Sequence, residues 1–267
     1  MAVEYLSGPD DPRVADYRDI AEPSLVRSKG LFVAEGRLVV SRLVADGRYR
    51  LRSVLVSEAA HRSMETTLAA VEGAPVYVCR AADVLGITGH DLHRGCLALA
   101  ERPAAITPAA ALTSSPRLVV VLEGVTNPDN VGGVFRNAAA LGARAVLLSP
   151  TCCDPLYRKA IRTSMAATLR VPYARLDDWP GGLATLRDRG YTIAALTPSE
   201  PSLDLRAFAE ASRAAPVALL AGTEGDGLTP SALSMADVRV RIPMAAGVDS
   251  LNLAVAVGIA LSHLGTV

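Results

Sequence analysis

From residue 117 onward, short apolar segments alternate with segments whose apolar residues recur every three or four positions. The short apolar segments, which we interpret as strands, lie at 117–125, 143–149, 168–174, 191–197, 215–222 and 238–244, and a helix is expected at 250–264. These strands are apolar on both faces, and helical segments separate them. That combination is typical of a parallel sheet covered by helices on both sides. The pattern predicts an α/β domain over 117–267.

The first hundred residues show the same alternation on a smaller scale. Apolar residues take helical spacing from about Glu35 to Gly47, and glycine commonly ends a helix. Other segments predict strands at 50–58, 74–80 and 95–101 and a helix at 59–73. We therefore expect a small α/β domain over 1–102, within the usual size range of a domain.

The segment between the two expected domains has a different composition. It holds three prolines among alanine, serine and threonine, and it lacks amphipathic periodicity. Segments of this composition are typical of loops and linkers. We interpret 103–116 as a linker between the domains 1–102 and 117–267.

Charge restricts the possible functions only slightly. Lysine plus arginine equals aspartate plus glutamate at 27 each, so binding to nucleic acid would need a local basic patch. Such a phosphate-binding patch could form in the first domain from Arg27, Lys29, Arg37, Arg42, Arg48, Arg50, Arg52 and Arg62. Acidic residues are interspersed among them, so an ordinary solvated surface is the alternative.

Cysteine spacing and hydropathy point to the cellular context. The four cysteines, at 79, 96, 152 and 153, have no spacing typical of a zinc site, so we expect reduced thiols and no metal. No apolar stretch has the length of a signal peptide near Met1 or of a membrane-spanning helix elsewhere. We therefore expect a cytoplasmic protein that does not enter a membrane.

Three loops expected at the carboxyl ends of strands combine glycine with polar residues. They are GVTNPDNVGGVFRN after the first strand of the second domain, GTEGDGL after the fifth and AAGVDSLN after the sixth. Ligands of open parallel sheets gather at this edge. An NAD-dependent oxidoreductase also fits the alternation of elements, but the G-x-G-x-x-G fingerprint and the acidic ribose ligand after the first strand are missing.

Together, the three loops resemble the signature motifs of the SpoU (TrmH-like) family of RNA ribose 2′-O-methyltransferases. The matching residues are Asn127, Pro128, Asn130, Gly132, Arg136 and Gly142 in the first motif, Gly222, Glu224, Gly225 and Gly227 in the second, and Ile242, Pro243, Met244, Gly247, Ser250, Leu251 and Asn252 in the third. The resemblance extends from Arg117 to Val267, and the segment 154–172 is similar to the family's intermediate segment.

The resemblance implies a parallel sheet whose carboxyl-terminal part forms a deep trefoil knot, a homodimer, and S-adenosylmethionine bound between the second and third loops. The stretches LFVAEGRLVVSRLVADG and HDLHRGCLALAE also resemble the ribosomal-protein-like substrate-binding domain of many rRNA-modifying members. Since tRNA-specific relatives typically lack that domain, ribosomal RNA is the expected substrate and tRNA is the alternative. A non-catalytic RNA-binding or assembly factor would tolerate loss of Arg136 and of the cofactor loop, and this sequence retains both.

The expected cofactor site consists mainly of main-chain groups. Glycines in the second loop leave the backbone open to a ligand, although glycines can also simply form a tight turn. By their positions in the motifs, Gly222, Ile242 and Leu251 are expected to meet the adenine and ribose of the cofactor through main-chain atoms. Gly227 and Met244 complete the expected cofactor-binding set.

Arg136 is the residue that the resemblance places at the reacting ribose. Methyl transfer is an in-line displacement, so the acceptor oxygen must be held close and aligned. The family's arginine has been regarded as a proton acceptor, but a guanidinium in a protein stays charged. Our hypothesis is that Arg136 clamps the adjacent phosphate and stabilises the developing alkoxide. A second serine, common in the family, is replaced here by Ala254.

Four further polar residues complete the expected catalytic set. Asn127 either caps the following helix or contacts the substrate. Glu224 is either an ordinary solvated carboxylate or orients Arg136 or Asn127 through a charge-assisted hydrogen bond. Ser250 and Asn252 either cap the last helix or bond the substrate and cofactor.

Overall fold

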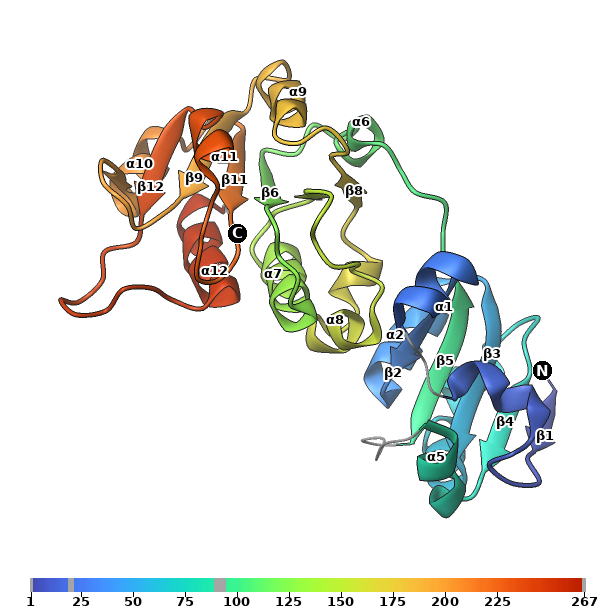
Figure 1. The fold of residues 1–267 in the computed structure, drawn as a ribbon. Coiled ribbons are helices and arrows are strands. Elements are labelled where there is room, and N and C mark those ends of the chain that lie inside the picture. Colours follow the sequence, from blue (N-terminus) through green and yellow to red (C-terminus); the bar gives the residue numbers. More distant parts are fainter. Residues whose placement is uncertain (1, 19–21, 89–94, 266–267) are drawn as a thin grey trace. The chain divides into compact units, whose positions relative to one another are not determined.

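The computed structural model describes residues 2–18, 22–88 and 95–265, and the chain divides into two compact units (Figure 1). The first unit combines Met1–Ala104 with Leu156–Leu169, and the second combines Ala105–Pro155 with Arg170–Val267. Each unit has its own sheet. The HDLHR part of one expected motif, at 90–94, lies outside the described residues.

The second unit contains a seven-stranded sheet in which every neighbouring pair is parallel. The strand order is β10-β12-β9-β11-β6-β7-β8. The strands are β6 (Leu118–Leu122), β7 (Val146–Leu148), β8 (Tyr173–Arg175), β9 (Thr192–Leu196), β10 (Leu203–Asp204), β11 (Val217–Ala221) and β12 (Val238–Arg241). The α/β class and the parallel sheet predicted from the alternation of elements are thereby confirmed.

The helices of the second unit lie before, between and after these strands. They are α6 (Pro108–Ala111), α7 (Pro128–Ala140), α9 (Ala184–Arg187), α10 (Leu205–Ala211), α11 (Pro230–Ser234) and α12 (Leu253–Leu264), with a short 3-10 turn η3 (Gly181–Leu183). The central strands β6 and β11 are buried at every position. One core cluster packs alternate residues of these strands, among them Val119 and Leu220, against Leu183, Leu186 and Tyr191.

Helices α7 and α12 lie side by side in this unit (Figure 1). The Asn137 side-chain amide donates to the backbone oxygen of Ala254 over 2.6 Å. A Cβ on Gly133 would lie only 2.6 Å from the Ala254 Cβ. Two small residues therefore let the first-motif helix and the last helix approach each other closely.

The first unit contains a mixed five-stranded sheet of order β1-β4-β3-β5-β2, in which β5 is antiparallel to both of its neighbours. Its strands are β1 (Val3–Tyr5), β2 (Leu31–Glu35), β3 (Leu51–Ser57), β4 (Val76–Cys79) and β5 (Cys96–Glu101). Its helices are η1 (Pro12–Tyr17), α1 (Glu22–Ser28), α2 (Arg37–Asp46), α3 (Glu58–Ser63), α4 (Glu65–Ala69), α5 (Ala81–Thr88), α8 (Arg158–Thr163) and η2 (Ala167–Leu169).

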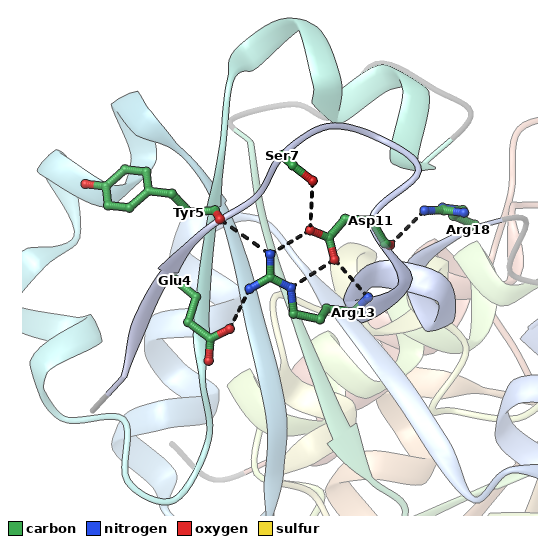
Figure 2. A network of polar contacts seen from close by, with 6 residues as sticks. All are labelled: Glu4, Tyr5, Ser7, Asp11, Arg13 and Arg18. Atoms are coloured by element: carbon green, nitrogen blue, oxygen red, sulfur yellow. Dashed lines mark hydrogen bonds and ion pairs between the residues drawn. The ribbon is translucent and has the colours of Figure 1, made fainter.

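An ion-pair network ties the start of this unit together (Figure 2). The Arg13 guanidinium bonds the carboxylates of Asp11 and Glu4 at 2.6 and 2.7 Å, and it also donates to the backbone oxygen of Tyr5. Hydrogen bonds from Arg13 hold the pKa of Asp11 well below its usual range, although burial of Asp11 acts in the opposite direction. Arg13 thus links β1 to η1.

Several of the expected basic residues already have protein partners. Lys29 pairs with Asp16, Arg48 with Asp46, and Arg50 and Arg52 with Glu101. The Arg42 guanidinium donates to the backbone oxygen of Met165. RNA contact through these residues stays a prediction.

Three element predictions need correction. Of the expected strand 168–174, only Tyr173 and Ala174 are extended, as part of β8, because 167–169 forms a 3-10 turn. The apolar residues there indicate burial and not a strand. The helix expected from about Glu35 to Gly47 is confirmed as α2, and the strand β2, which the sequence did not predict, precedes it. The helix expected at 59–73 breaks at Met64 into α3 and α4.

The third correction concerns the expected linker. Thr107 caps the four-residue helix α6, and Leu112 is buried in the core of the second unit. A helix of four residues is too short to show periodicity in the sequence. Composition therefore did not reveal that the second half of 103–116 packs into the second unit.

Candidate functional site

A cavity of 490 Å³ opens in the second unit at the carboxyl ends of β9, β11 and β12. It is lined by most of the residues predicted for the site: Gly222, Glu224, Gly227, Ile242, Met244, Ser250, Leu251 and Asn252. These residues come from the second and third motif loops. The structure therefore brings together two segments that the sequence separates by two secondary-structure elements.

The second loop is a tight glycine turn. Gly225 and Gly227 have φ of 89° and 71°, which favour glycine. A Cβ on Gly222 would lie 2.2 Å from the backbone oxygen of Gly227. The backbone N–H of Gly227 donates to the Thr223 oxygen over 3.1 Å. The glycines are thus required by the turn itself, and the same turn lines the cavity.

Asn252 connects all three motif segments. Its side-chain oxygen accepts from the Val255 N–H over 3.2 Å, which makes Asn252 the N-cap of α12. Its side-chain amide donates to Asn130 Oδ1 over 3.0 Å and to Glu224 Oε1 over 2.6 Å. One side chain therefore joins α7, the second loop and the start of α12.

Glu224 has a different partner from those expected. Its carboxylate accepts from the Asn252 amide and, at 3.5 Å, from the backbone N–H of Leu253. A carboxylate at the amino terminus of a helix is favoured by the helix dipole. Glu224 thus orients the start of α12, rather than Arg136 or Asn127.

Asn127 lies outside the cavity and caps α7. Its side-chain oxygen accepts from the backbone N–H of Asp129 over 2.9 Å, and Pro128 occupies the first helical position. Of the two roles that the sequence left open, the structure contains the capping one. Ser250, by contrast, is an exposed lining residue and is not the cap of α12.

Arg136 is exposed on α7 and does not line the cavity. Among residues 2–18, 22–88 and 95–265, no hydrogen-bond or ion-pair partner is found for its guanidinium. The side chain is therefore available to an external anion such as a phosphate, the ligand for which a guanidinium is well suited. Within a single chain, Arg136 does not reach the cavity at which the predicted contact with a reacting ribose would be made.

The cavity also has walls that sequence reasoning missed. Thr197, Pro198 and Ser199, directly after β9, line it. The expected strand at 191–197 could have indicated this loop, because loops at the carboxyl ends of neighbouring parallel strands share one edge. The loop lacks glycine and matches no motif, so nothing distinguished it from an ordinary turn.

The lining suggests a nucleoside-sized ligand. Leu196, Ile242 and Leu251 supply apolar surface, while the glycine turn supplies main-chain polar groups. A volume of 490 Å³ lies within the usual range for small-molecule sites. Within the described residues, no group of three or more histidine, cysteine, aspartate or glutamate side chains is arranged to hold a metal ion. In the same part of the chain, every helix is too short or too polar to cross a membrane.

Comparisons with known proteins agree with this geometry. The sequence model of the SpoU rRNA Methylase family matches residues 117–262. An uncharacterized tRNA/rRNA methyltransferase of Mycobacterium bovis is 42% identical over 264 residues, which are 97% of this chain and 91% of the relative. A 23S rRNA (guanosine-2′-O-)-methyltransferase of Ralstonia nicotianae is 32% identical over 242 residues, 88% of this chain and 94% of the relative.

A solved structure is also similar over nearly the whole chain. The AdoMet-bound rRNA methyltransferase from Sinorhizobium meliloti superposes with a TM-score of 0.81 at 25% sequence identity. The superposition covers 98% of this chain and 97% of that structure. The similarity therefore includes both units.

Proposed function

Because the chain belongs to the SpoU rRNA methylase family, a family of RNA methyltransferases, we propose that it transfers a methyl group from S-adenosylmethionine to a ribose 2′ oxygen in RNA. The observation that carries this proposal is the joining of the three motif segments at one cavity through Asn252. The 2′-O-specific relative and the AdoMet-bound structure support the choice of acceptor atom and of cofactor.

The residues of the cavity fit S-adenosylmethionine. Apolar side chains of Ile242 and Leu251 would cover the flat adenine, and main-chain groups next to Gly222 and Gly227 would bond its polar edge. When bound, S-adenosylmethionine supplies an electrophilic methyl group. Glu224 and Asn252 would then hold the loops closed around the cofactor, because their mutual hydrogen bond bridges the second loop and α12.

The proposed role of Arg136 is to hold the RNA. Its exposed guanidinium would bind a phosphate next to the target ribose and stabilise negative charge that develops on the 2′ oxygen. Since Arg136 does not line the cavity of its own chain, this role requires the homodimer that we also propose. In support, Val255 on the apolar helix α12 is 51% exposed, and a helix that is apolar on all sides is usually buried.

We further propose ribosomal RNA as the substrate, a deep trefoil knot in the second unit and a cytoplasmic location. The first unit would act as the ribosomal-protein-like substrate-binding domain. In support of the knot, the chain leaves β12 and then returns as α12 to pack beside α7, which follows β6. A crystal structure in which the chain of the second unit is not knotted would contradict that part of the proposal.

The reaction can be tested with methyl-labelled S-adenosylmethionine and purified rRNA or tRNA. We expect label in rRNA with the native protein, and loss of transfer with normal cofactor binding in Arg136→Ala. Arg144→Ala is the matched control, because Arg144 is also an exposed arginine of the second unit. Near-normal transfer by Arg136→Ala would remove Arg136 from the mechanism, and label in tRNA alone would replace the proposed substrate.

A further inference from the structure

Glu123 is a buried carboxylate that none of the roles above uses. It follows β6 directly and is 5% exposed. Oε1 accepts from the Trp179 indole N–H and from the Thr229 hydroxyl, both over 2.7 Å. Oε2 accepts from the Thr229 backbone N–H over 2.8 Å. Both carboxylate oxygens are therefore hydrogen-bonded, which compensates the cost of burying a charged group.

The bonds to Thr229 fix the carboxyl-terminal end of the loop 222–228, the cavity-lining loop proposed to bind the cofactor. Thr229 comes immediately after Leu228, which lines the cavity. The Thr229 hydroxyl also accepts from the Ala232 N–H over 3.2 Å and so caps α11. A carboxylate that bonds both the N–H and the hydroxyl of Thr229 leaves this residue little freedom to move.

The amino-terminal end of the same loop is fixed by Glu123 as well. The Glu123 backbone N–H donates to the oxygen of Ala221 over 2.9 Å, and Ala221 is the last residue of β11 before Gly222. One residue therefore bonds the chain just before and just after the loop 222–228. Inside the loop, Gly222 and Gly227 already approach each other too closely to admit a Cβ.

Resting on the proposed function, we propose that Glu123 is a positioning residue that holds both ends of the loop 222–228 in its cofactor-binding shape and couples that loop to the indole of Trp179. Because Trp179 is the single tryptophan of the sequence, tryptophan emission reports on the surroundings of this indole, which include its hydrogen bond to Glu123. Binding of S-adenosylmethionine should then change the intrinsic fluorescence, although Trp179 does not line the cavity.

The test measures S-adenosylmethionine binding by calorimetry and by Trp179 emission in the full chain. We expect Glu123→Gln to weaken binding about tenfold, because the amide replaces one acceptor by a donor that faces the Thr229 donors. The emission change should be largely lost. At saturating cofactor, kcat should stay within about twofold of the native value while KM for the cofactor rises, since Glu123 touches neither reactant.

Two further variants keep the test decisive. Trp179→Phe removes one donor but leaves Thr229 anchored, so binding should stay within about twofold of native. Thr229→Val keeps the N–H and the size of the side chain but lacks the hydroxyl, so it should weaken binding several-fold, whereas Thr229→Ser should restore it. Thr229→Val decides the question if Glu123→Gln does not fold.

The outcomes separate this inference from the proposed function. A native protein that does not bind S-adenosylmethionine contradicts the proposed function. If the native protein binds S-adenosylmethionine and Glu123→Gln binds it with the same affinity, the positioning role alone is overturned. Where Glu123→Gln does not fold, the same result with Thr229→Val overturns it. Native binding without any change in Trp179 emission overturns the coupling to the indole.

Discussion

Asn252 shows how one side chain can serve both the fold and the site. Its oxygen caps α12, and its amide joins Asn130 of α7 to Glu224 of the glycine loop. The sequence left capping and ligand contact as alternatives for Asn252. The structure shows that capping uses only the oxygen, so the amide is free to organise the neighbouring loops.

Substitution of Asn252 can separate these two roles. Asn252→Ala should lower the free energy of unfolding by about 1 kcal/mol through loss of the cap, and it should also reduce methyl transfer strongly. Asn252→Ser restores a capping oxygen but not the amide, so stability should recover while activity stays low. Urea unfolding and transfer assays on the three proteins measure both effects. Full activity in Asn252→Ser would mean that the residue acts only as a cap.

Individual residues of the candidate site differ in whether their place could be predicted from the sequence. The glycines at 222, 225 and 227 pointed to the cavity because a strand-end turn with several glycines is unusual. Glu224 lines the same cavity as the other residues of its motif, but its bond to Asn252 spans 28 residues and depends on tertiary packing. No spacing rule encodes such a pair.

At the scale of elements, the contact between α7 and α12 determines where the first motif lies. Gly133 faces Ala254, and the two helices come so close that an added Cβ would lie 2.6 Å from its neighbour. For the substitution of Gly133 by alanine, helix propensity therefore predicts a gain in stability and packing predicts a loss. The direction of the measured change in stability decides between them.

Gly133→Ala is that substitution. Helix propensity alone would stabilise the protein by about 1 kcal/mol, whereas the close contact should make the variant less stable than the native protein. Ala139→Gly, at an exposed position of the same helix, measures the propensity term by itself. Chemical unfolding of both variants gives the comparison. A stabilised Gly133→Ala would show that the helices are farther apart than described.

The link between β1 and η1 gives a second prediction at this scale, for pH. The pKa of Asp11 is depressed in the folded chain by hydrogen bonds from Arg13, while an unfolded aspartate titrates near 4. The folded state therefore gains stability from the ionised Asp11 above pH of about 4, and this gain is lost as the pH falls toward the depressed pKa.

Asp11→Asn removes this dependence. We expect the native protein to be more stable than Asp11→Asn by a constant amount above pH of about 5, and the difference should shrink steadily as the pH falls below about 4. Urea unfolding of the first unit at several pH values measures it. A difference that does not vary with pH would mean that Asp11 is not held ionised by Arg13.

Elements were predicted well where their periodicity was long and undisturbed. The helix expected at 250–264 appears as α12, and the central strands appear within the expected ranges. The short elements β1, β10 and α6 were missed because two to four residues carry no detectable period. The segment near 168 was misassigned because an apolar run does not distinguish a buried turn from a strand.

At the scale of the whole molecule, a single chain forms the cavity proposed for the cofactor but leaves Arg136 outside it. The proposed homodimer resolves this separation and also covers the exposed apolar side of α12. Local sequence patterns describe one chain and its immediate neighbours, so neither the dimer nor a knot follows from periodicity. These features rest on the family resemblance.

Val255→Glu tests the proposed interface. A charge at this exposed position should be tolerated by the fold but not by an apolar interface, so we expect a native dimer and a monomeric variant. Sedimentation at micromolar concentration measures the mass of each protein. The monomeric variant should still bind S-adenosylmethionine in calorimetry but should transfer methyl groups poorly. A native protein that sediments as a monomer while transferring methyl groups would contradict the dimer.

The most direct test of the central claim is the position of the transferred methyl group. RNA labelled by the native protein is hydrolysed completely with alkali, which cannot cleave the bond next to a 2′-O-methyl ribose. We predict that the label stays in an alkali-resistant dinucleotide. Label recovered in single nucleotides would show methylation of a base and would contradict the proposed reaction.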